Sequence, residues 1–221
     1  YQHYSAAMRA SKEAALVNLV ASDKPQDIYQ FIADQVTVVV RKDADAVTDD
    51  HCTCDQQDSM CACCKKAVAK LWLNKVTRKV CKRPVMTSGY NSNAYGFTDQ
   101  IMQDVMEKLN RRVIDPKDSL AEHPFAFGRD KRGFTAAKYL AQIIYDKVRL
   151  NLSAATDGMD FFKECLSAWS RRGEHFCMSS PLGFPFFQDY SNHDTIKVKP
   201  WMWSNGVRKR VQVTLRADND N

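Results

Sequence analysis

The sequence has no apolar run that approaches the 18 or so residues needed to span a membrane, so no membrane partner is expected. It also has no initiator methionine and no leader in which a charged segment precedes an apolar one. Hydrophobic residues nevertheless make up 44% of the 221 residues, enough to bury a core in one large domain or two small ones. We therefore expect a soluble piece of a longer protein.

Acidic residues are missing from two segments, 75–83 and 196–216, although charged residues make up 26% of the chain. Both segments are rich in lysine and arginine, and the rest of the chain is net negative even though the whole carries +6. A single basic run is commonly a solvated face. Two such runs together predict that the protein contacts polyanions at defined places.

The eight cysteines do not indicate a secreted disulfide scaffold, because the chain is long and well supplied with core residues. A reducing compartment fits the sequence better. Five of the cysteines crowd into residues 52–64, directly after His51, and several are spaced Cys-x-Cys. That cluster could hold zinc between thiolates, although Cys-x-x-Cys is the more usual zinc spacing. The alternative is a polar loop that contains thiols and no metal.

A cationic and aromatic pattern occupies residues 78–97. On an α-helix Lys82 lies about 40° around the axis from Arg78, and Tyr90 lies about 80° beyond Lys82, so all three can face one cleft. Their axial spread is about 18 Å, somewhat longer than a nucleotide. A guanidinium and an ammonium suit a triphosphate, and an aromatic ring suits the sugar. A basic amphipathic helix with an incidental tyrosine fits the spacing equally well.

The amino-acid pattern of this segment resembles motif B of the single-subunit, bacteriophage-type DNA-dependent RNA polymerases. The match comprises Lys82-Arg83-Pro84-Val85-Met86-Thr87, Tyr90 and Tyr95-Gly96-Phe97. Three more segments resemble that family in the same order along the chain. They are Gln2 to Ala6 with Arg9, after the first catalytic carboxylate; Leu16 to Leu19 and Gln26 to Tyr29, in the following helices; and Pro181 to Pro185 with Gln188 to Tyr190, before the promoter hairpin.

The resemblance implies nucleotidyl transfer from ribonucleoside triphosphates, with two magnesium ions held by two aspartates. Neither aspartate can be placed in this chain, because one would precede Tyr1 and the other would follow Asn221. The isolated piece is therefore expected to be inactive. By resemblance, Arg78, Lys82 and Tyr90 bind the nucleotide, Lys82 also acts as the catalytic proton donor to pyrophosphate, and Tyr95 contacts the template.

The last quarter of the sequence changes to the period of two that β-strands show. We expect a hairpin with strands at 196–203 and 207–215 and an Asn-Gly turn at 204–206. If the register aligns them, Lys197, Lys199, Trp201 and Trp203 share a face with Arg208, Arg210, Gln212 and Arg216. We predict that Lys197, Lys199, Arg208, Arg210 and Gln212 bind DNA, because a ribbon of this kind fits the major groove. An exposed ribbon with a polar face is the alternative.

The expected fold is mainly α with a C-terminal β-hairpin, an α+β fold, and by resemblance the fingers region of a right-hand polymerase. Residues 1–12 are assigned to a small palm remnant, 13–194 to the fingers and 195–217 to the DNA-reading hairpin. A Cys-rich insertion occupies 42–64. Apolar spacing and capping signals predict helices over 6–21, 22–38, 67–73, 97–109, 136–150 and 159–171.

Two details of the nucleotide helix are expected to be unusual. Pro84 should kink the helix or restart it, because proline lacks the backbone donor and clashes with the preceding turn. Asn91 stands where the family generally has glycine, and asparagine is the next best residue for a left-handed helix end.

The expected partners are promoter and template DNA, nascent RNA and ribonucleoside triphosphates, bound by a monomer. The phage-like residue pattern of motif B indicates the cytoplasm of an infected bacterium, with the mitochondrion as the alternative. Two other classes stay open at this point. One is a family A DNA polymerase, which has a similar Arg, Lys and Tyr helix, and the other is a DNA-binding module without catalysis.

Overall fold

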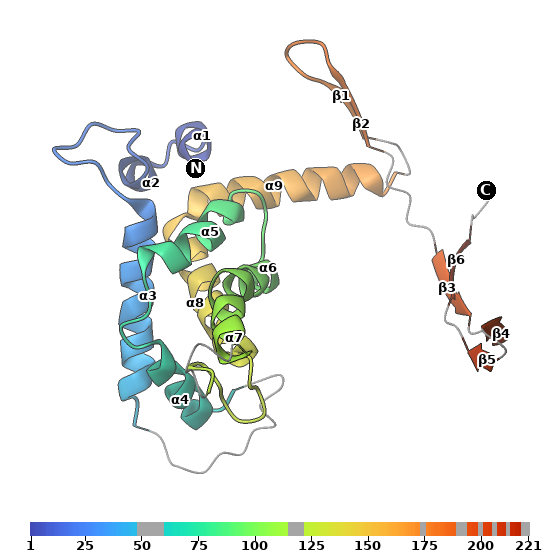
Figure 1. The fold of residues 1–221 in the computed structure, drawn as a ribbon. Coiled ribbons are helices and arrows are strands. Elements are labelled where there is room, and N and C mark those ends of the chain that lie inside the picture. The colour runs from blue at the N-terminus through green and yellow to red at the C-terminus, as the bar shows by residue number, and fades with distance from the viewer. Residues whose placement is uncertain are drawn as a thin grey trace. The chain divides into compact units, whose positions relative to one another are not determined.

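The computed structural model describes residues 1–47, 60–114, 122–172, 176–188, 194–198, 201–204, 207–210 and 213–217. The chain forms two compact units, Tyr1–Lys163 and Glu164–Asn221. The first unit is helical, and the second contains the end of the last helix followed by β-strands (Figure 1). The mainly α composition with a C-terminal hairpin is therefore confirmed.

The described helices run from the N-terminus to Ser170. They are α1 Gln2–Ala7, α2 Ser11–Leu16, α3 Ile28–Asp45, α4 Ala62–Trp72, α5 Arg78–Ser88, α6 Ala94–Ile101, the π-helical η1 Met102–Met106, α7 Glu107–Ile114, α8 Phe134–Asn151 and α9 Ser153–Ser170. Among the described residues, none of these helices combines the length and apolar character required to cross a membrane.

The first two predicted helices are wrong in their boundaries. Residues 6–21 do not form one helix, because Arg9 and Asn18 have left-handed backbone conformations with φ of 53° and 58°. The next helix begins after Asp27 instead of at residue 22, and it continues to Asp45 instead of ending at residue 38, so its last turn occupies the start of the segment 42–64 that was assigned to a Cys-rich insertion. Most of the Cys-rich insertion, residues 48–59, lies outside the described residues.

The later helices match their predicted positions and are longer than expected. The segment predicted over 97–109 is one helical run through α6, η1 and α7, with a five-residue π-helical stretch in its middle. Its apolar residues Phe97, Ile101 and Met106 are fully buried, as their spacing predicts. The predictions over 136–150 and 159–171 correspond to α8 and α9.

Helix α8 lies at the centre of the core and packs against α3, α4, α5 and α6 (Figure 1). Small residues on α8, including Ala136, Ala137 and Ala141, are completely buried and allow neighbouring helices to approach closely. Trp72 at the end of α4 is buried as well, and its indole Nε1 donates to the Ala136 carbonyl at 2.9 Å. This buried hydrogen bond fixes α4 on α8.

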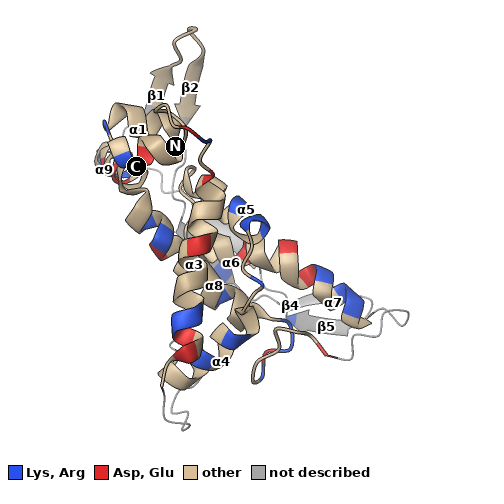
Figure 2. Cartoon of the chain, turned by 90° about the vertical axis from the view of Figure 1, so that its left-hand side faces the viewer, with Lys and Arg blue, Asp and Glu red and all other residues tan. Residues whose placement is uncertain are grey.

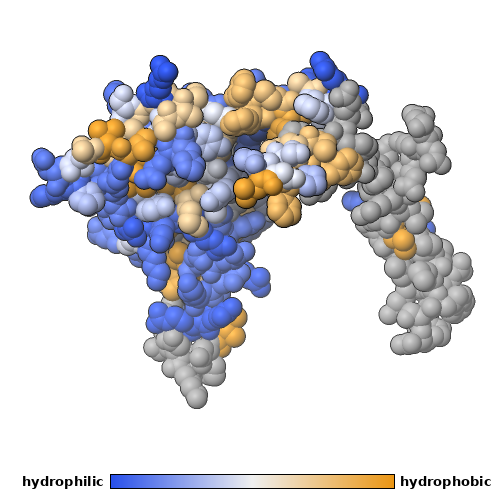
Figure 3. Space-filling view, turned by 90° about the horizontal axis from the view of Figure 1, so that it is seen from above, coloured by the Kyte–Doolittle hydropathy of each residue, from blue (hydrophilic) through white to orange (hydrophobic). Residues whose placement is uncertain are grey.

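Large apolar side chains are exposed along α9. Phe161, Phe162, Leu166 and Trp169 are each more than 40% exposed. Hydrophobic residues are visible on the face of the molecule that Figure 3 shows. The part of α9 that carries these four residues therefore lies outside the core that positions the other helices.

The strands form antiparallel pairs. They are β1 Phe176–Ser179 with β2 Pro185–Gln188, β3 Asp194–Val198 with β6 Val213–Ala217, and β4 Trp201–Ser204 with β5 Val207–Arg210. In the β3–β6 and β4–β5 ladders, the two residues of each pair lie the same number of positions before and after residues 205–206 in the sequence. The two ladders therefore follow the register of a single hairpin around the predicted Asn-Gly turn, which itself lies outside the described residues.

Residues 181–184 form the turn of the first hairpin, between β1 and β2, and Pro185 begins β2. Ser180 is bonded to both ends of this turn, since its amide donates to the Phe184 carbonyl at 2.7 Å and its carbonyl accepts from the Gly183 amide at 2.9 Å. Gly183 has a φ of 84°, which only glycine adopts without strain. The glycine in this segment therefore has a local structural reason.

Candidate functional site

The basic segment forms α5, a helix that continues without interruption through Pro84. Cys81, Pro84, Val85 and Ser88 lie on its buried face. The helix therefore does not restart at Pro84. Proline is tolerated at this position while the opposite face carries the basic residues into solvent (Figure 2).

The C-terminal end of α5 has the cap predicted for Asn91. The Asn91 amide donates to the Ser88 carbonyl at 3.0 Å, and the Ser92 amide donates to the Thr87 carbonyl at 3.2 Å. With Asn91 at φ 69°, these two bonds make a Schellman motif. The left-handed residue at this helix end is therefore asparagine, as expected.

Two exposed aromatic residues flank the turn between α5 and α6. Tyr90 is 84% exposed and lies just beyond α5, while Tyr95 is 70% exposed in the first turn of α6. The Asn93 side chain caps α6 by accepting from the Gly96 amide at 3.0 Å. Capped helix ends on both sides hold these rings at defined places, and neither ring belongs to the core.

Arg78, the first residue of α5, is held by the start of α3. Its Nε donates to Oδ2 of Asp27 at 2.5 Å, and its guanidinium carbon lies 5.4 Å from the centre of the Tyr29 ring. Asp27 is also the N-cap of α3, because it accepts from the amides of Tyr29 and Gln30 at 3.0 and 3.2 Å. Partial burial tends to raise the pKa of Asp27, but the hydrogen bonds from Arg78 and these amides outweigh it and hold the pKa below its ordinary value.

The capping role of Asp27 was not predicted from the sequence, because the predicted helix began at residue 22, five positions before Asp27. The available signal was an aspartate directly before the apolar spacing of 28–40, which is the ordinary N-cap pattern. A pairing with Arg78 has no comparable local signal.

A pocket of about 660 Å³ opens beside this ion pair. Its walls come from the start of the chain, the end of α2, the segment before α3 and the first residue of α5. They are lined by Tyr1, Gln2, His3, Leu16, Val17, Asn18, Pro25, Gln26, Asp27, Ile28, Tyr29 and Arg78. The pocket thus brings Arg78, the predicted triphosphate-binding residue, together with residues that precede it by 49 or more positions.

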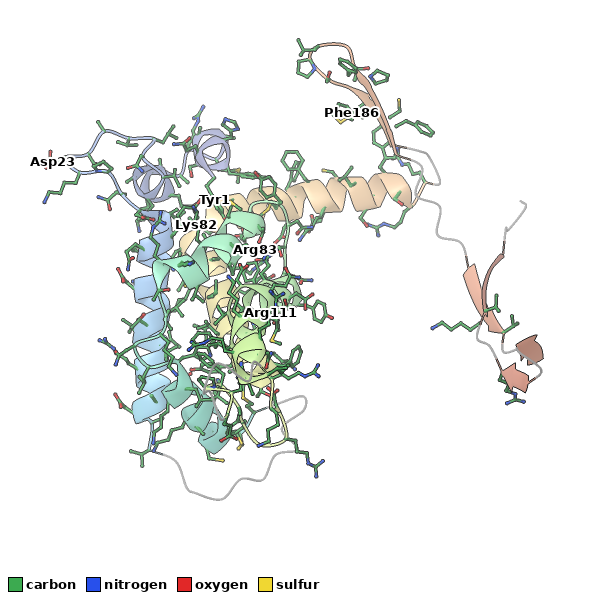
Figure 4. The ribbon with its side chains drawn as sticks, in the orientation of Figure 1. Tyr1, Asp23, Lys82, Arg83, Arg111 and Phe186 are labelled. Atoms are coloured by element: carbon green, nitrogen blue, oxygen red, sulfur yellow. The ribbon has the colours of Figure 1, made fainter. Side chains whose placement is uncertain are left out.

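The five basic residues of 75–83 differ in what they contact. Lys75 lies over the Phe125 ring, with Nζ 4.6 Å from its centre, and Arg83 donates to Asp104 at 3.0 Å and to Gln103 at 3.1 Å. Lys79 and Lys82 are exposed and have no ion pair among the described residues. Figure 4 shows the side chains of Lys82 and Arg83 leaving α5 in different directions. Lys82 is therefore one of two cations on α5 that form no ion pair with any described residue.

The first residue of the chain packs on the second half of α5. The Tyr1 hydroxyl donates to the Val85 carbonyl, and its ring lies beside Gly89. Burial raises the pKa of the Tyr1 phenol to about 12. Residues at the N-terminus and the predicted nucleotide helix are therefore neighbours.

Three of the clustered cysteines come together at the start of α4. The Sγ atoms of Cys61, Cys63 and Cys64 all lie within 4.8 Å of one another. Among the described residues this is the one group of three or more His, Cys, Asp or Glu side chains placed to share an ion. Magnesium is bound by oxygen ligands, so this group of thiols does not fit the magnesium implied by the resemblance.

The predicted DNA-binding residues lie on the second unit. The register places Trp201 opposite Arg210 and Trp203 opposite Arg208, as a shared basic and aromatic face requires. Lys197 and Arg210 are exposed. Lys199 and Gln212 lie outside the described residues, and the DNA-binding role of all five predicted residues stays a prediction.

Comparison with known proteins gives a consistent family. The family model of the DNA-dependent RNA polymerases matches residues 1–216. The chain is 33% identical over 198 residues to DNA-directed RNA polymerase 2, chloroplastic/mitochondrial, of Arabidopsis thaliana, covering 90% of this chain and 17% of that protein. It is 30% identical over 241 residues to T7 RNA polymerase of Escherichia phage T7, covering 100% of this chain and 25% of that protein.

A third relative, DNA-directed RNA polymerase 1, mitochondrial, of Arabidopsis thaliana, is 31% identical over 227 residues, covering 99% of this chain and 20% of that protein. The chain thus spans a quarter or less of the length of these three relatives. The match extends over both compact units and includes the segments around Arg78, Lys82 and Tyr90. The chain belongs to the phage-type DNA-dependent RNA polymerase family.

Proposed function

We propose that this chain is the part of a DNA-dependent RNA polymerase that binds the incoming ribonucleoside triphosphate and contacts promoter and template DNA. The observation that carries the proposal is the arrangement on α5. Arg78 and Lys82 lie on its exposed side, Lys82 without an ion pair in the part of the chain that the structure describes, and Tyr90 follows at its capped end. Membership of the polymerase family gives this arrangement a substrate, the nucleoside triphosphate.

Each residue has a separate role in this proposal. Arg78 binds the triphosphate with its guanidinium, whose direction is set by Asp27 and the Tyr29 ring. Lys82 binds the phosphates as well and gives a proton to the departing pyrophosphate. Tyr90 reads the sugar, and Tyr95 meets the template base. The exposure of both rings, 84% and 70%, supports roles outside the core.

By the family resemblance, the two magnesium ions would be held by two aspartates outside this chain. Among the described residues, the one group of three or more side chains placed to share an ion consists of thiols, which suit magnesium poorly. The isolated chain is accordingly proposed to bind nucleotide and DNA without catalysing transfer. The assignments to fingers, palm remnant and promoter hairpin belong to the same proposal, as does a monomeric state.

The compartment follows the relatives only coarsely. They include a phage enzyme and plant chloroplast and mitochondrial enzymes, at about equal identity. The phage-like residue pattern of 82–87 supports a location in the cytoplasm of a phage-infected bacterium, and the mitochondrion is the alternative location.

One experiment separates the candidate functions. The complete product of the gene that contains this chain would be given a DNA template with either ribonucleotides or deoxyribonucleotides. We expect polymerisation of ribonucleotides. Incorporation of deoxyribonucleotides alone would favour a DNA polymerase, and DNA binding without any incorporation would favour a DNA-binding module; either result overturns the proposal.

A further inference from the structure

A compact group of three thiols marks the beginning of α4. Cys61 is the N-cap of this helix, and Cys63 and Cys64 lie in its first turn. Their Sγ atoms lie within 4.8 Å of one another, and those of Cys61 and Cys63 are 2.9 Å apart. Cys61 and Cys64 are also spaced Cys-x-x-Cys, the spacing that places two thiols on one side of a helix start.

The separations suit a tetrahedral thiolate site. Zinc bound to sulfur at about 2.3 Å places neighbouring sulfur atoms about 3.8 Å apart. The three Sγ atoms lie within 4.8 Å of one another, about 1 Å from this spacing at most, and those of Cys61 and Cys63 would need to separate by about 1 Å from their present 2.9 Å. Sulfur is the sole donor in the group, which selects a thiophilic ion such as zinc over magnesium or calcium.

The surroundings also favour thiolates at this place. A helix N-terminus stabilises negative charge, and α4 has no acidic residue in its first turn. Lys65 and Lys66 follow directly and add positive charge. Cys64 is only 3% exposed, whereas Cys61 and Cys63 are partly exposed. One ligand is thus fixed by packing, and the other two leave a route for the ion.

We propose that Cys61, Cys63 and Cys64 bind one zinc ion that fixes the start of α4. Each thiol releases its proton to solvent as its sulfur binds the metal, and no electron is transferred. The fourth position on the ion is filled by water or by a further donor. Because α4 packs against α3 and α8, the ion stabilises the helical unit and has no part in nucleotide chemistry. The proposal is independent of the proposed function.

The test uses the whole chain, reduced and freed of metal, with Zn²⁺ titrated against a chromophoric chelator and Co²⁺ added as a spectroscopic substitute. We expect one ion per chain and a thiolate-to-cobalt charge-transfer band. Cys61→Ser and Cys63→Ser should each weaken binding at least tenfold. Cys165→Ser, an exposed cysteine outside the group, should leave the affinity unchanged.

Circular dichroism of each variant shows whether the helices are retained, and the partly exposed positions are chosen because Cys64→Ser would disturb a buried side chain. Absence of stoichiometric zinc in the reduced wild-type chain would overturn the proposal. So would a cobalt complex without the thiolate band, or equal loss of affinity in Cys165→Ser. Formation of a Cys61–Cys63 disulfide in place of zinc binding would overturn it as well.

Discussion

Arg78 at the start of α5 donates to Asp27 at the start of α3, so one ion pair joins two helix ends that are 51 residues apart in the sequence. The same aspartate caps α3 through the amides of Tyr29 and Gln30. The position of Arg78, the residue predicted to bind the triphosphate, is therefore coupled to the N-cap of α3.

Replacing Asp27 with asparagine separates these two roles. Asparagine retains the cap, so only the ion pair is lost, and because both side chains are more than a third exposed the cost should be below about 1 kcal/mol at neutral pH. Asp27→Ala loses the cap as well and should cost about 1 kcal/mol more. Urea unfolding of the two variants and the wild type measures both terms.

The pH dependence of this pair has a defined sign. The pKa of Asp27 is lower in the folded chain than its ordinary value, so its stabilisation is present above that ordinary value and is lost as the pH falls through the lowered pKa. The difference between wild type and Asp27→Asn should therefore be largest near neutral pH and vanish in acid. A difference that grows on acidification would contradict the assignment.

Replacing Lys82 with alanine tests the catalytic role in the complete polymerase. Loss of a general acid and phosphate ligand should reduce the rate of nucleotide addition by about 10²- to 10⁴-fold, with little change in DNA binding. Lys79→Ala is the matched control, because Lys79 is also exposed on α5 without an ion pair among the described residues. Single-turnover kinetics measures the step, and unchanged turnover in Lys82→Ala would refute the role.

The hydroxyl of Tyr90 is expected to contribute to ribose selection. Tyr90→Phe keeps the ring at the capped end of α5 but removes the hydroxyl, so discrimination between ribo- and deoxyribonucleotides should decrease while the fold is unchanged. Tyr95→Phe, at the other exposed ring, should leave sugar discrimination as it was. The ratio of kcat/KM for the two nucleotide types gives the answer, and an unaltered ratio in Tyr90→Phe would exclude this role.

The cap at Asn91 can be tested by stability alone. Asn91→Ala should destabilise the chain by about 1 kcal/mol, because alanine is poorly suited to the left-handed conformation, whereas Asn91→Gly should be neutral or stabilising. Asn110→Ala, within α7, should cost less, since alanine is the better helix former there and the hydrogen bond that it removes, to the Arg132 carbonyl, is long at 3.5 Å. Thermal or urea unfolding compares the three, and equal effects of alanine at both asparagines would contradict the cap.

Local patterns were sufficient for much of the fold. The apolar spacing of residues 97–109 and 136–150 predicted helices because a 3.6-residue repeat buries one face wherever the helix packs. The alternation of residue types and the Asn-Gly turn predicted the register of the C-terminal hairpin, which contains β3 to β6, because a short turn determines which residues pair on either side of it. The left-handed cap at Asn91 followed from the few residues that adopt such a conformation.

The misplaced helix boundaries came from breaks that apolar spacing does not reveal. Arg9 and Asn18 adopt left-handed conformations although neither is glycine. The Asn18 side chain bonds both the amide and the carbonyl of Gln26. Such a bridge between segments is invisible to a periodicity argument.

By itself the sequence determined the family, the mainly helical composition and the candidate residues Arg78, Lys82 and Tyr90. Sequence motifs and the short-range spacing of residues are local properties of the chain, so they can be recognised without the fold. Only the tertiary structure decided which cations are available. Arg83 is bonded to Asp104, 21 residues away, and Arg78 to Asp27, while Lys82 has no ion pair among the described residues. The reason is physical: charge pairing depends on distance in space, and packing around α8 sets those distances.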